Sequence, residues 1–576
     1  MYFKNMTGHD VWLGVYNLQD ELYVATLFAW GKRIQIKNNE TWVMSQKELS
    51  WGISEFPSLV QVIFWSSGAL GNMYTRLKSV SSSSMEVCIT QIDEDNYYLK
   101  LDNSLFYHNI AIPYPTVVEN PHSLNELIYY ISTAAEQRLK IRAVGGGYSF
   151  SDVAHTDGAF LYTQNLNKVL VLDSSMLHAG LSQENLWKVE AGISVQALNE
   201  ILWNEGKALI NQGGYDKQSI FGALCTGTHG SGITLGSIAS TVRSMHIITL
   251  NDRWEIRQLQ VEPSNGITNR SAHLKKYPDI ELIQDDEVFY SCLVSFGVMG
   301  ITYSVVIEVR NAYWLKEDRV KQLWSKTKQQ MLSGLVHNVQ YRHIEMLVNP
   351  YKETVVLTLR QEVDATTPSG ARNIVQSEFA KIKFLADKIQ ALANSNPEGI
   401  PDLIEAALDG TTDSDVINRC YKILNIGPAN ELPVVSSEVG IDATDISNVI
   451  NAVDDIIIFL QRISNSHRRY ITAPFALRFV KADESFLSMA YGRDTCMIET
   501  PMLNETNGLD DTLHELRELL KQKYDGRPHW GQLLEITTDE VKKMYPKFDL
   551  FKRVYEDLNI SGAFRSAMTK RIGLDD

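Results

Sequence analysis

The sequence has 576 residues, too many for one hydrophobic core, and its 44% hydrophobic and 21% charged residues are typical of a globular protein of several domains. Its formal net charge of −15 argues against a nucleic-acid partner, since such proteins present a basic surface. Its five cysteines are widely spaced and its start lacks a signal-peptide pattern, so we expect a cytoplasmic protein without a disulfide framework or a metal site. No apolar run approaches the roughly 20 residues that span a bilayer, so no transmembrane segment is expected.

Residues 1–108 predict a small all-β domain. Apolar and polar residues alternate at 10–16 and 60–65, and clusters of turn-forming residues separate such segments. The aromatic residues suit packing within sheets better than a carbohydrate-binding platform. We expect a β-sandwich-like accessory domain, followed by an extended linker at residues 103–115 that two prolines stiffen.

Between residues 109 and 311 the sequence predicts an α+β domain. A capping box at 123–126 opens a helix that extends to about Arg138, and a short strand at 141–144 follows. A second helix is expected at 195–205. Further strands are expected at 116–118, 161–163, 169–172, 187–190, 242–250 and 300–309.

Residues 312–576 also mix strands and helices and form the third predicted domain. Long amphipathic helices are expected at 371–394, 443–464 and 509–523. Strands are expected at 345–348, 354–359 and 476–480. The acidic segment 401–425 is expected to be rich in loops.

Two glycine-rich loops carry the strongest functional signal. Residues 145–150 read Gly-Gly-Gly-Tyr-Ser-Phe after a predicted strand, and residues 226–232 read Thr-Gly-Thr-His-Gly-Ser-Gly after the apolar segment 209–211. Backbone N–H groups in such loops can face an anion because no Cβ blocks the approach. Neither loop has the lysine of a P-loop or a GxGxxG pattern. Together they predict a slot that binds a pyrophosphate.

Five segments in a fixed order extend this signal: 142–152, 219–232, 295–302, the pair 478–483 and 490–495, and 527–531. They resemble the PCMH-type FAD-binding domain of the vanillyl-alcohol oxidase superfamily, and most of all the alditol oxidases and aldonolactone oxidases. The resemblance is strong over residues 112–311, patchy beyond them, and absent from residues 1–108. It implies that FAD lies between two α+β lobes. A C-terminal substrate domain would cover the cofactor with an antiparallel sheet, and its last segment would return to the flavin.

The resemblance also implies which residues contact FAD. Many relatives have a histidine where this chain has Tyr148, and that histidine is covalently bonded to the flavin. A phenol is not equivalent, so we predict non-covalent FAD. Cys225 does not align with the cysteine that bicovalent relatives use. The expected cofactor-binding residues are Gly145, Gly146, Gly147, Tyr148, Ser149, Gly213, Gly214, Ser219, Gly222, Gly227, Thr228, His229, Gly230, Ser231 and Ile301.

Two departures from the family pattern concern catalysis. Alditol oxidases carry Glu-x-Arg where this chain has Ala476-Leu477-Arg478, and relatives often carry lysine in place of Gln532. Oxidation of an alcohol needs a base or cation that stabilises the developing alkoxide. Glu499 is the carboxylate that might replace the missing one, and a loop-shaping role is expected for His229. The expected catalytic residues are Arg478, Glu499, His529 and Gln532.

The resemblance therefore implies an FAD-dependent oxidoreductase that acts on a CH–OH group of a polyol, sugar or aldonolactone. Glycines at 213 and 214 would leave room for O2 beside the flavin, which favours an oxidase over a dehydrogenase. The expected partners are a small-molecule alcohol and O2. Two alternatives stay open: a catalytically weakened flavoprotein whose N-terminal β-domain binds a glycan, lipid or protein, and a sterol-type alcohol oxidase.

Overall fold

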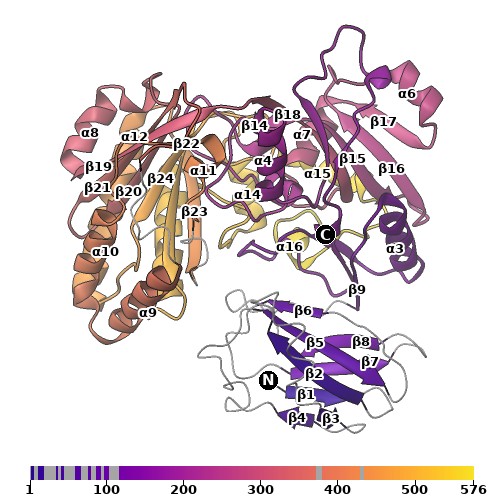
Figure 1. Ribbon diagram of the computed structural model, residues 1–576, viewed down its shortest axis with the longest axis horizontal. Coiled ribbons are helices and arrows are strands. Elements are labelled where there is room, and N and C mark those ends of the chain that lie inside the picture. Colours follow the sequence, from indigo (N-terminus) through magenta and orange to yellow (C-terminus); the bar gives the residue numbers. More distant parts are fainter. Residues whose placement is uncertain are drawn as a thin grey trace. The chain divides into compact units, whose positions relative to one another are not determined.

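The structure is a computed structural model that describes residues 116–370, 379–427, 432 and 434–575, together with the strand segments β1 to β8 of the preceding chain. The chain divides into two compact units, residues 1–114 and 115–576 (Figure 1). The predicted linker at 103–115 lies outside the described residues. The second unit contains both of the other predicted domains.

The first unit contains two four-stranded sheets. In one, β4 (Thr41–Val43), β1 (Tyr2–Asn5), β7 (Glu86–Gln91) and β8 (Tyr97–Asp102) lie in that order, with β1 and β7 parallel. In the other, β3 (Ile34–Ile36), β2 (Val11–Asn17), β5 (Leu59–Ser66) and β6 (Thr75–Lys78) are antiparallel. All the described elements of this unit are strands, and they form these two sheets.

The second unit begins with a three-stranded parallel sheet in the order β10 (Ile141–Val144), β11 (Ala159–Tyr162), β9 (Val117–Glu119). Helix α3 (Leu124–Glu136) buries Leu127 and Ile131 in the same core as these strands. Ser123 caps this helix by accepting the Glu126 N–H at 3.2 Å. The Glu126 carboxylate instead accepts the N–H of His122, so the predicted capping box forms only in half.

A seven-stranded sheet forms the larger lobe of this part. Its order is β12 (Val169–Leu170), β13 (Leu186–Glu190), β18 (Ile301–Asn311), β15 (Val242–Leu250), β16 (Ile256–Glu262), β17 (Ile280–Gln284), and β14 (Lys207–Leu209) also pairs with β18. Its helices are α4 (Val195–Asn204), α5 (Ile220–Cys225), α6 (Arg270–Lys276) and α7 (Asp286–Leu293). Short 3-10 turns lie at Thr163–Asn165, Ser174–Met176 and Ile238–Thr241.

An antiparallel sheet of eight strands follows, as the resemblance implied. Its order is β22 (Val416–Arg419), β19 (Trp314–Leu323), β21 (Thr354–Val363), β20 (His343–Asn349), β24 (Phe475–Val480), β25 (Thr495–Leu503), β23 (Val434–Asp442), β26 (Arg527–Pro528). Helices α8 (Trp324–Leu332), α12 (Ile446–His467) and α13 (Leu509–Tyr524) pack on one face of this sheet in a common core. Because side chains alternate along a strand, the intervening residues point to the opposite face.

The prediction of a loop-rich segment at 401–425 is wrong. This stretch contains most of α10 (Ile400–Asp409), then β22 and α11 (Cys420–Leu424). Ile400, Ile404 and Leu408 recur at helical spacing and are buried, which outweighs the acidic composition. The predicted helix at 371–394 corresponds to α9 (Phe379–Ser395), and residues 371–378 lie outside the described residues. Two 3-10 turns lie at Leu335–His337 and Pro397–Gly399.

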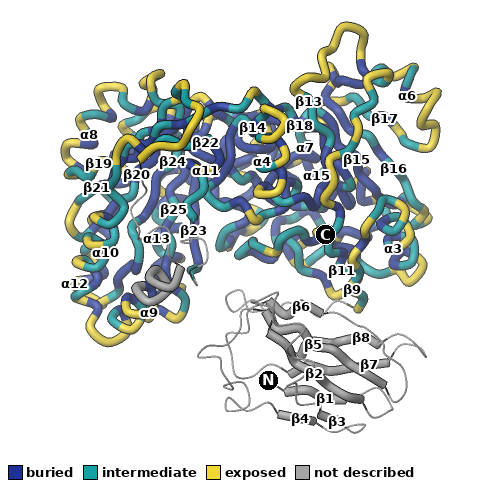
Figure 2. The backbone as a smooth tube through the Cα atoms, in the orientation of Figure 1, coloured by how far each residue is buried: buried dark blue, intermediate teal, exposed yellow. Residues whose placement is uncertain are grey.

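The C-terminal segment returns to the lobe that carries the glycine-rich loops. Helices α14 (Thr538–Met544), α15 (Phe548–Leu558) and α16 (Ala567–Arg571) contribute to the same core as β15 and β18, and α15 lies beside α7 (Figure 1). Figure 2 shows that exposed backbone in this unit lies chiefly in its outer loops and helices. Within the described residues, no helix has both the length and the hydrophobicity that a membrane span needs.

Candidate active site

The first glycine-rich loop lies directly against the start of α5. A Cβ on Gly145 would be 1.8 Å from Ser219 Oγ, and one on Gly146 would be 3.0 Å from the carbonyl oxygen of Lys217. Gly147 has a φ of +71°, which favours glycine. This close approach requires residues without side chains. It also brings the two predicted walls of the slot together, because Ser219 is the N-cap of the helix that leads into the second loop.

The second loop follows α5, a six-residue helix, rather than the apolar segment 209–211 directly. Ser219 Oγ accepts the N–H of Gly222 at 3.2 Å and so caps this helix. Gly227 and Gly232 have φ values of +80° and +134°. A Cβ on Gly230 would be 2.3 Å from Asn211 Oδ1. The glycines are therefore needed to fold this loop tightly against its neighbours.

Four backbone N–H groups of the two loops, those of Gly147, Ser149, His229 and Gly230, meet no hydrogen-bond acceptor among the residues that the structure describes. Backbone donors of this kind suit an anion, since a phosphate oxygen can accept several of them at once. The slot therefore fits the pyrophosphate of a dinucleotide such as FAD. The ring of Tyr148 packs edge-on against Tyr215, with 4.6 Å between their centroids.

The remaining predicted cofactor residues lie near this slot or in the core. A Cβ on Gly213 would be 3.2 Å from the carbonyl oxygen of His229, and one on Gly214 would be 2.9 Å from Ile426. Ile301 lies at the start of β18, and its side chain packs in the hydrophobic core with Ile248. Close packing against His229 and Ile426 thus explains why residues 213 and 214 are glycines. The Ile301 side chain lies in a hydrophobic core.

Arg142 joins the first motif to the third. Its guanidinium is buried and donates to the carbonyl oxygens of Phe296 at 2.8 Å and Gly297 at 3.2 Å. Burial lowers the pKa of Arg142 to about 10, so the group stays charged. Cys225 lies nearby, and burial raises the pKa of its thiol to about 12. A buried, protonated thiol does not suit covalent attachment of a flavin.

Arg478 on β24 is surrounded by three carboxylates. Its Nη1 donates to Glu499 at 2.5 Å and lies 3.6 Å from Glu438, and its Nε donates to Glu345 at 2.9 Å. Burial alone would lower the pKa of Arg478, but the nearby carboxylates, Glu499 first, outweigh it and raise the pKa. Arg478 is therefore a fixed cation, and the structure brings it together with Glu499.

Strand register explains how Glu499 reaches this position. Ala476 of β24 pairs directly with Glu499 of β25, so both residues point to the same face as Arg478. A carboxylate thus comes from the neighbouring strand at the position where the Glu-x-Arg pattern is broken. Glu499 also accepts hydrogen bonds from Ser436 Oγ at 3.0 Å and Gln532 Nε2 at 3.5 Å.

Comparisons with known proteins show which families the two parts of this unit match. Residues 115–254 match the family described as FAD binding domain, and residues 305–572 match D-arabinono-1,4-lactone oxidase. The chain is an FAD-dependent oxidoreductase. It is 26% identical over 461 residues to L-gulono-1,4-lactone dehydrogenase of Mycobacterium tuberculosis, covering 80% of this chain and 96% of the relative. It is 24% identical over 471 residues to L-gulonolactone oxidase of Bos taurus, covering 80% and 95%.

The fold of this oxidoreductase is also similar to a solved structure, cholesterol oxidase from B. sterolicum. The TM-score is 0.65 at 14% identity, and the match covers 81% of this chain and 95% of the other. At this identity the likeness concerns the fold.

The second glycine-rich loop of the oxidoreductase contacts the eight-stranded sheet through its side chains as well as its backbone. Ser231 Oγ donates to the carbonyl oxygen of Ile344 and accepts the N–H of Phe479 at 3.1 Å. The Gly232 N–H donates to the carbonyl oxygen of Phe479 at 2.6 Å. The predicted pyrophosphate loop therefore lies against the eight-stranded sheet.

A buried cluster of two histidines and a glutamate lies at this contact. His229 Nε2 is 3.3 Å from Glu438 Oε1, and the His529 N–H donates to the Glu438 carbonyl oxygen at 2.9 Å. The ligand-type atoms of the three side chains lie within 4.8 Å of one another. However, His529 Nδ1 accepts the N–H of Gly531 at 3.0 Å, so a neutral His529 carries its proton on Nε2. That nitrogen then has no lone pair for a metal, and the donor pattern favours a hydrogen-bonded cluster.

The electrostatics of this cluster differ from residue to residue. Burial would raise the pKa of Glu438, but His229 and other cations lower it to about 2. Burial lowers the pKa of His529 to about 4, so this ring is neutral near pH 7. Burial would also lower the pKa of His229, yet the charge and hydrogen bond of Glu438 more than offset this and raise it.

The charged residues form a buried stripe across the eight-stranded sheet. From Glu345 the stripe continues to Arg360, whose Nη atoms donate to it at 3.2 Å, and then to Glu317, which accepts from Arg360 Nε at 2.6 Å. Arg319 pairs with Glu317 at 3.1 Å. Sequence reasoning missed Glu317, Glu345, Arg360 and Glu438. For Glu345 and Glu438 the available signal was a charged residue inside a strand with few other charges, which marks a buried polar face.

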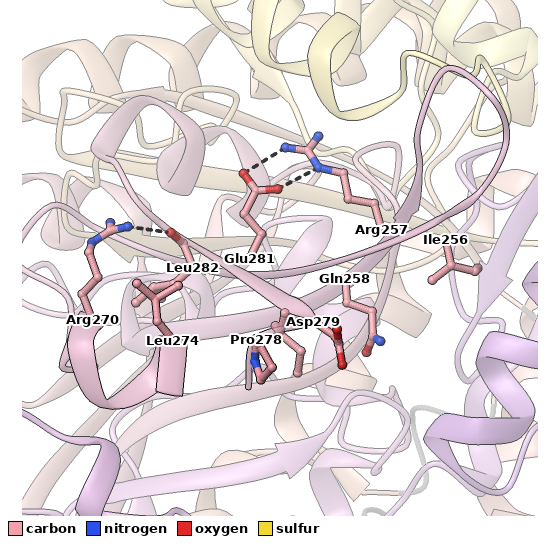
Figure 3. A pocket seen from close by; sticks show the side chains of 10 residues that line it. Ile256, Arg257, Gln258, Arg270, Leu274, Pro278, Asp279, Glu281 and Leu282 are labelled. Atoms are coloured by element: carbon pink, nitrogen blue, oxygen red, sulfur yellow. Dashed lines mark hydrogen bonds and ion pairs between the residues drawn. The ribbon is translucent and has the colours of Figure 1, made fainter. Parts of the chain in front are cut away.

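A separate surface hollow lies between β16, α6 and β17 (Figure 3). Arg257 and Glu281 form a two-point ion pair there at 2.9 and 3.2 Å, and Arg270 donates to the carbonyl oxygen of Leu282 at 3.2 Å. Its lining contains none of the residues predicted to bind FAD or substrate. The candidate active site is therefore the contact between the glycine-rich loops and the charged stripe.

Proposed function

We propose that this oxidoreductase oxidises a CH–OH group of an aldonolactone or a closely related polyhydroxylated sugar. The observation that carries the proposal is Arg478, a fixed cation held by Glu345, Glu438 and Glu499 on the sheet that meets the second glycine-rich loop. The printed names of the relatives, L-gulono-1,4-lactone dehydrogenase and L-gulonolactone oxidase, support this class of substrate.

Each part of the site has a role in this reaction. The substrate loses its C–H hydrogen as hydride and its O–H hydrogen as a proton, and a C=O bond forms. When bound, FAD supplies the acceptor for the hydride. Arg478 stabilises the negative charge that develops on the oxygen, and Glu499 is the carboxylate placed to receive the proton. Gln532 and His529 orient the polar groups around Glu499 and Glu438.

The charged stripe favours a hydrophilic substrate over a sterol. A steroid ring system needs an apolar pocket, and burying it beside Arg478 and Glu499 would strip water from charges without replacing their hydrogen bonds. A lactone with several hydroxyl groups can donate to Glu499 and accept from Arg478. The similarity to cholesterol oxidase concerns the fold and gives no information about the substrate.

The proposed cofactor site uses the two glycine-rich loops. Residues 145–149, 213–214, 219, 222 and 227–231 would hold FAD, with its pyrophosphate on the free N–H groups of the loops. We propose that the attachment is non-covalent because Tyr148 offers a phenol rather than an imidazole. We also propose O2 as the final electron acceptor, because residue 213 is a glycine.

The test is anaerobic mixing of FAD-loaded protein with L-gulono-1,4-lactone, D-arabinono-1,4-lactone, a polyol and cholesterol. Loss of the visible flavin absorbance with a lactone is the expected result. The variant Arg478→Gln should keep FAD but slow the reduction by about 10² to 10³-fold, as removal of one stabilising donor does. The matched control is Arg310→Gln, in an exposed pair with Glu362, which should reduce normally. A yellow protein that no substrate bleaches would support the weakened flavoprotein and contradict this proposal.

A further inference from the structure

Both ring nitrogens of His229 face hydrogen-bond acceptors. Nδ1 is 2.8 Å from the carbonyl oxygen of Gly230, and Nε2 is 3.3 Å from Glu438 Oε1. A neutral imidazole has one N–H and one lone pair, so in that form one nitrogen would set its lone pair against an acceptor. The imidazolium donates to Gly230 at Nδ1 and forms an ion pair with Glu438 at Nε2. Because the side chains of His229 and Glu438 are each only 4% exposed, water does not replace a lost partner.

The charge balance of the stripe leads to the same form of His229. Among the described residues the linked chain from Arg319 to Glu438 contains three arginines and four glutamates: Arg319, Arg360, Arg478, Glu317, Glu345, Glu438 and Glu499. Within this set the carboxylates outnumber the guanidinium groups by one, and an imidazolium at His229 adds a cation beside Glu438.

Few other groups near His229 could supply a positive charge beside Glu438. The titratable groups that face it are Glu438 on β23, Arg478 on β24 and His529 after β26. His529 does not serve, because its Nδ1 accepts the Gly531 N–H and its ring is neutral. Glu499 on β25 reaches the cluster only through Arg478.

We propose that His229 is a permanent imidazolium held by Glu438, and that it is the second fixed cation of the active site beside Arg478. The proposal rests on the proposed function for its catalytic meaning. It assigns a charge to the glycine-rich loop, at a residue that the sequence analysis expected only to shape that loop. Glu438 is then a positioning residue that acts through His229.

A cationic His229 would explain why this chain can have the neutral Gln532 at a position where relatives often have lysine. Reduction of a flavin adds negative charge, and a nearby cation stabilises the reduced form. His229 lies in the loop that we propose to bind FAD, whereas Arg478 shares its charge with three carboxylates. The histidine cation would therefore take over the electrostatic role of the missing lysine.

The direct test is NMR on the full-length protein with 13C-labelled histidine, with and without FAD. Loss of one signal in His229→Gln assigns the residue among the 13 histidines. We expect its shift to stay in the imidazolium range from about pH 6 to about pH 8. In Glu438→Gln the same signal should move to the neutral range at about pH 7. A neutral His229 in the wild-type protein at about pH 7 would overturn the proposal, whatever the enzyme's activity.

Stability against pH gives a second readout, with His246→Gln as the matched control. The folded-state pKa of His229 is raised above its usual 6.5, so its contribution to stability is full below 6.5 and is lost as pH rises through the folded value. His246 is also buried, but its pKa is lowered to about 4, so its contribution falls as pH decreases from 6.5 towards 4. The difference in unfolding free energy between wild type and each variant should change with pH in opposite directions. Parallel trends would overturn the proposal.

The flavin midpoint potential tests the catalytic meaning separately. In His229→Gln it should become more negative, because the reduced form loses a stabilising cation while the Glu438 carboxylate stays charged. In Glu438→Gln the shift should be smaller, because the cation and the carboxylate charge are lost together. An unchanged potential in both variants, with an imidazolium seen by NMR, would show that the cation exists but does not act on the flavin. That outcome would overturn the catalytic part of the proposal.

Discussion

Replacing Gly145 with alanine should weaken FAD binding more than a glycine-to-alanine substitution at any other position of the first loop. The added Cβ would lie 1.8 Å from Ser219 Oγ and 2.7 Å from Ser219 Cβ. To restore an ordinary contact of 3.4 Å, the loop or α5 must move by about 1.6 Å. Ser219 is the N-cap of α5, so the movement also breaks its hydrogen bond to Gly222.

The magnitude of the effect follows from these two losses. Overpacking at a tight contact costs about 1–3 kcal/mol, and loss of an N-cap costs about 1 kcal/mol. Gly145→Ala should therefore destabilise the FAD-free protein by roughly 2–4 kcal/mol. Because the N–H groups of both walls are displaced, FAD should also bind at least about 100-fold more weakly, which corresponds to about 2.7 kcal/mol.

The assay combines flavin content after purification, FAD titration of the stripped protein, and denaturant unfolding. Ser219→Ala alone should cost about 1 kcal/mol, but in the Gly145→Ala background it should restore part of the stability because it removes the clashing Oγ. Gly180→Ala is the control for backbone strain alone, because its φ of +84° disfavours alanine but its Cβ would meet no atom within 4 Å, so it should lose some stability and bind FAD normally. If Gly145→Ala bound FAD normally and unfolded like the wild type, the close contact between the loop and α5 would be refuted.

Two further predictions concern the cofactor. Acid precipitation should release all flavin into the supernatant, because Tyr148 offers no imidazole for attachment, and yellow colour in the pellet would show that this reasoning is wrong. Gly213→Ala should slow reoxidation by O2 at least about tenfold, an effect of about 1.4 kcal/mol, while anaerobic reduction by substrate is less affected. The new Cβ would lie 3.2 Å from the carbonyl oxygen of His229. Stopped-flow absorbance separates the two half-reactions, and unchanged reoxidation would remove the case for O2 access at this residue.

The sequence predicted those parts of the site that lie within one short segment. The strand at 141–144 and the glycines that follow it are local features, and the structure places them as expected. Arg478 and Glu499 were both named as catalytic candidates because they lie near recognisable motifs, but their pairing was not predicted. The capping box at 123–126 formed only in half because the Glu126 carboxylate accepts the N–H of His122 instead.

The rest of the stripe was not predictable in the same way. Glu317, Glu345 and Glu438 lie on three strands that are not consecutive in the sheet, and their contacts depend on strand order and register. A shift of one residue in any strand would turn its charged side chain into the opposite core. Alternation within a strand indicates a polar face, but it does not say which charge lies opposite.

The pairing of Arg478 also determines how the site can assist the removal of a proton. With three carboxylates at 2.5 to 3.6 Å, little of its positive charge is left to attract an alkoxide. If Glu499 accepts the substrate proton, that carboxylate becomes neutral and Arg478 regains attraction for the oxygen at the same moment. The stabilising charge thus appears as the alkoxide forms, which favours the transition state over the bound substrate. On this reasoning the site needs no lysine at position 532, because protonation of Glu499 makes the positive charge of Arg478 available to the alkoxide.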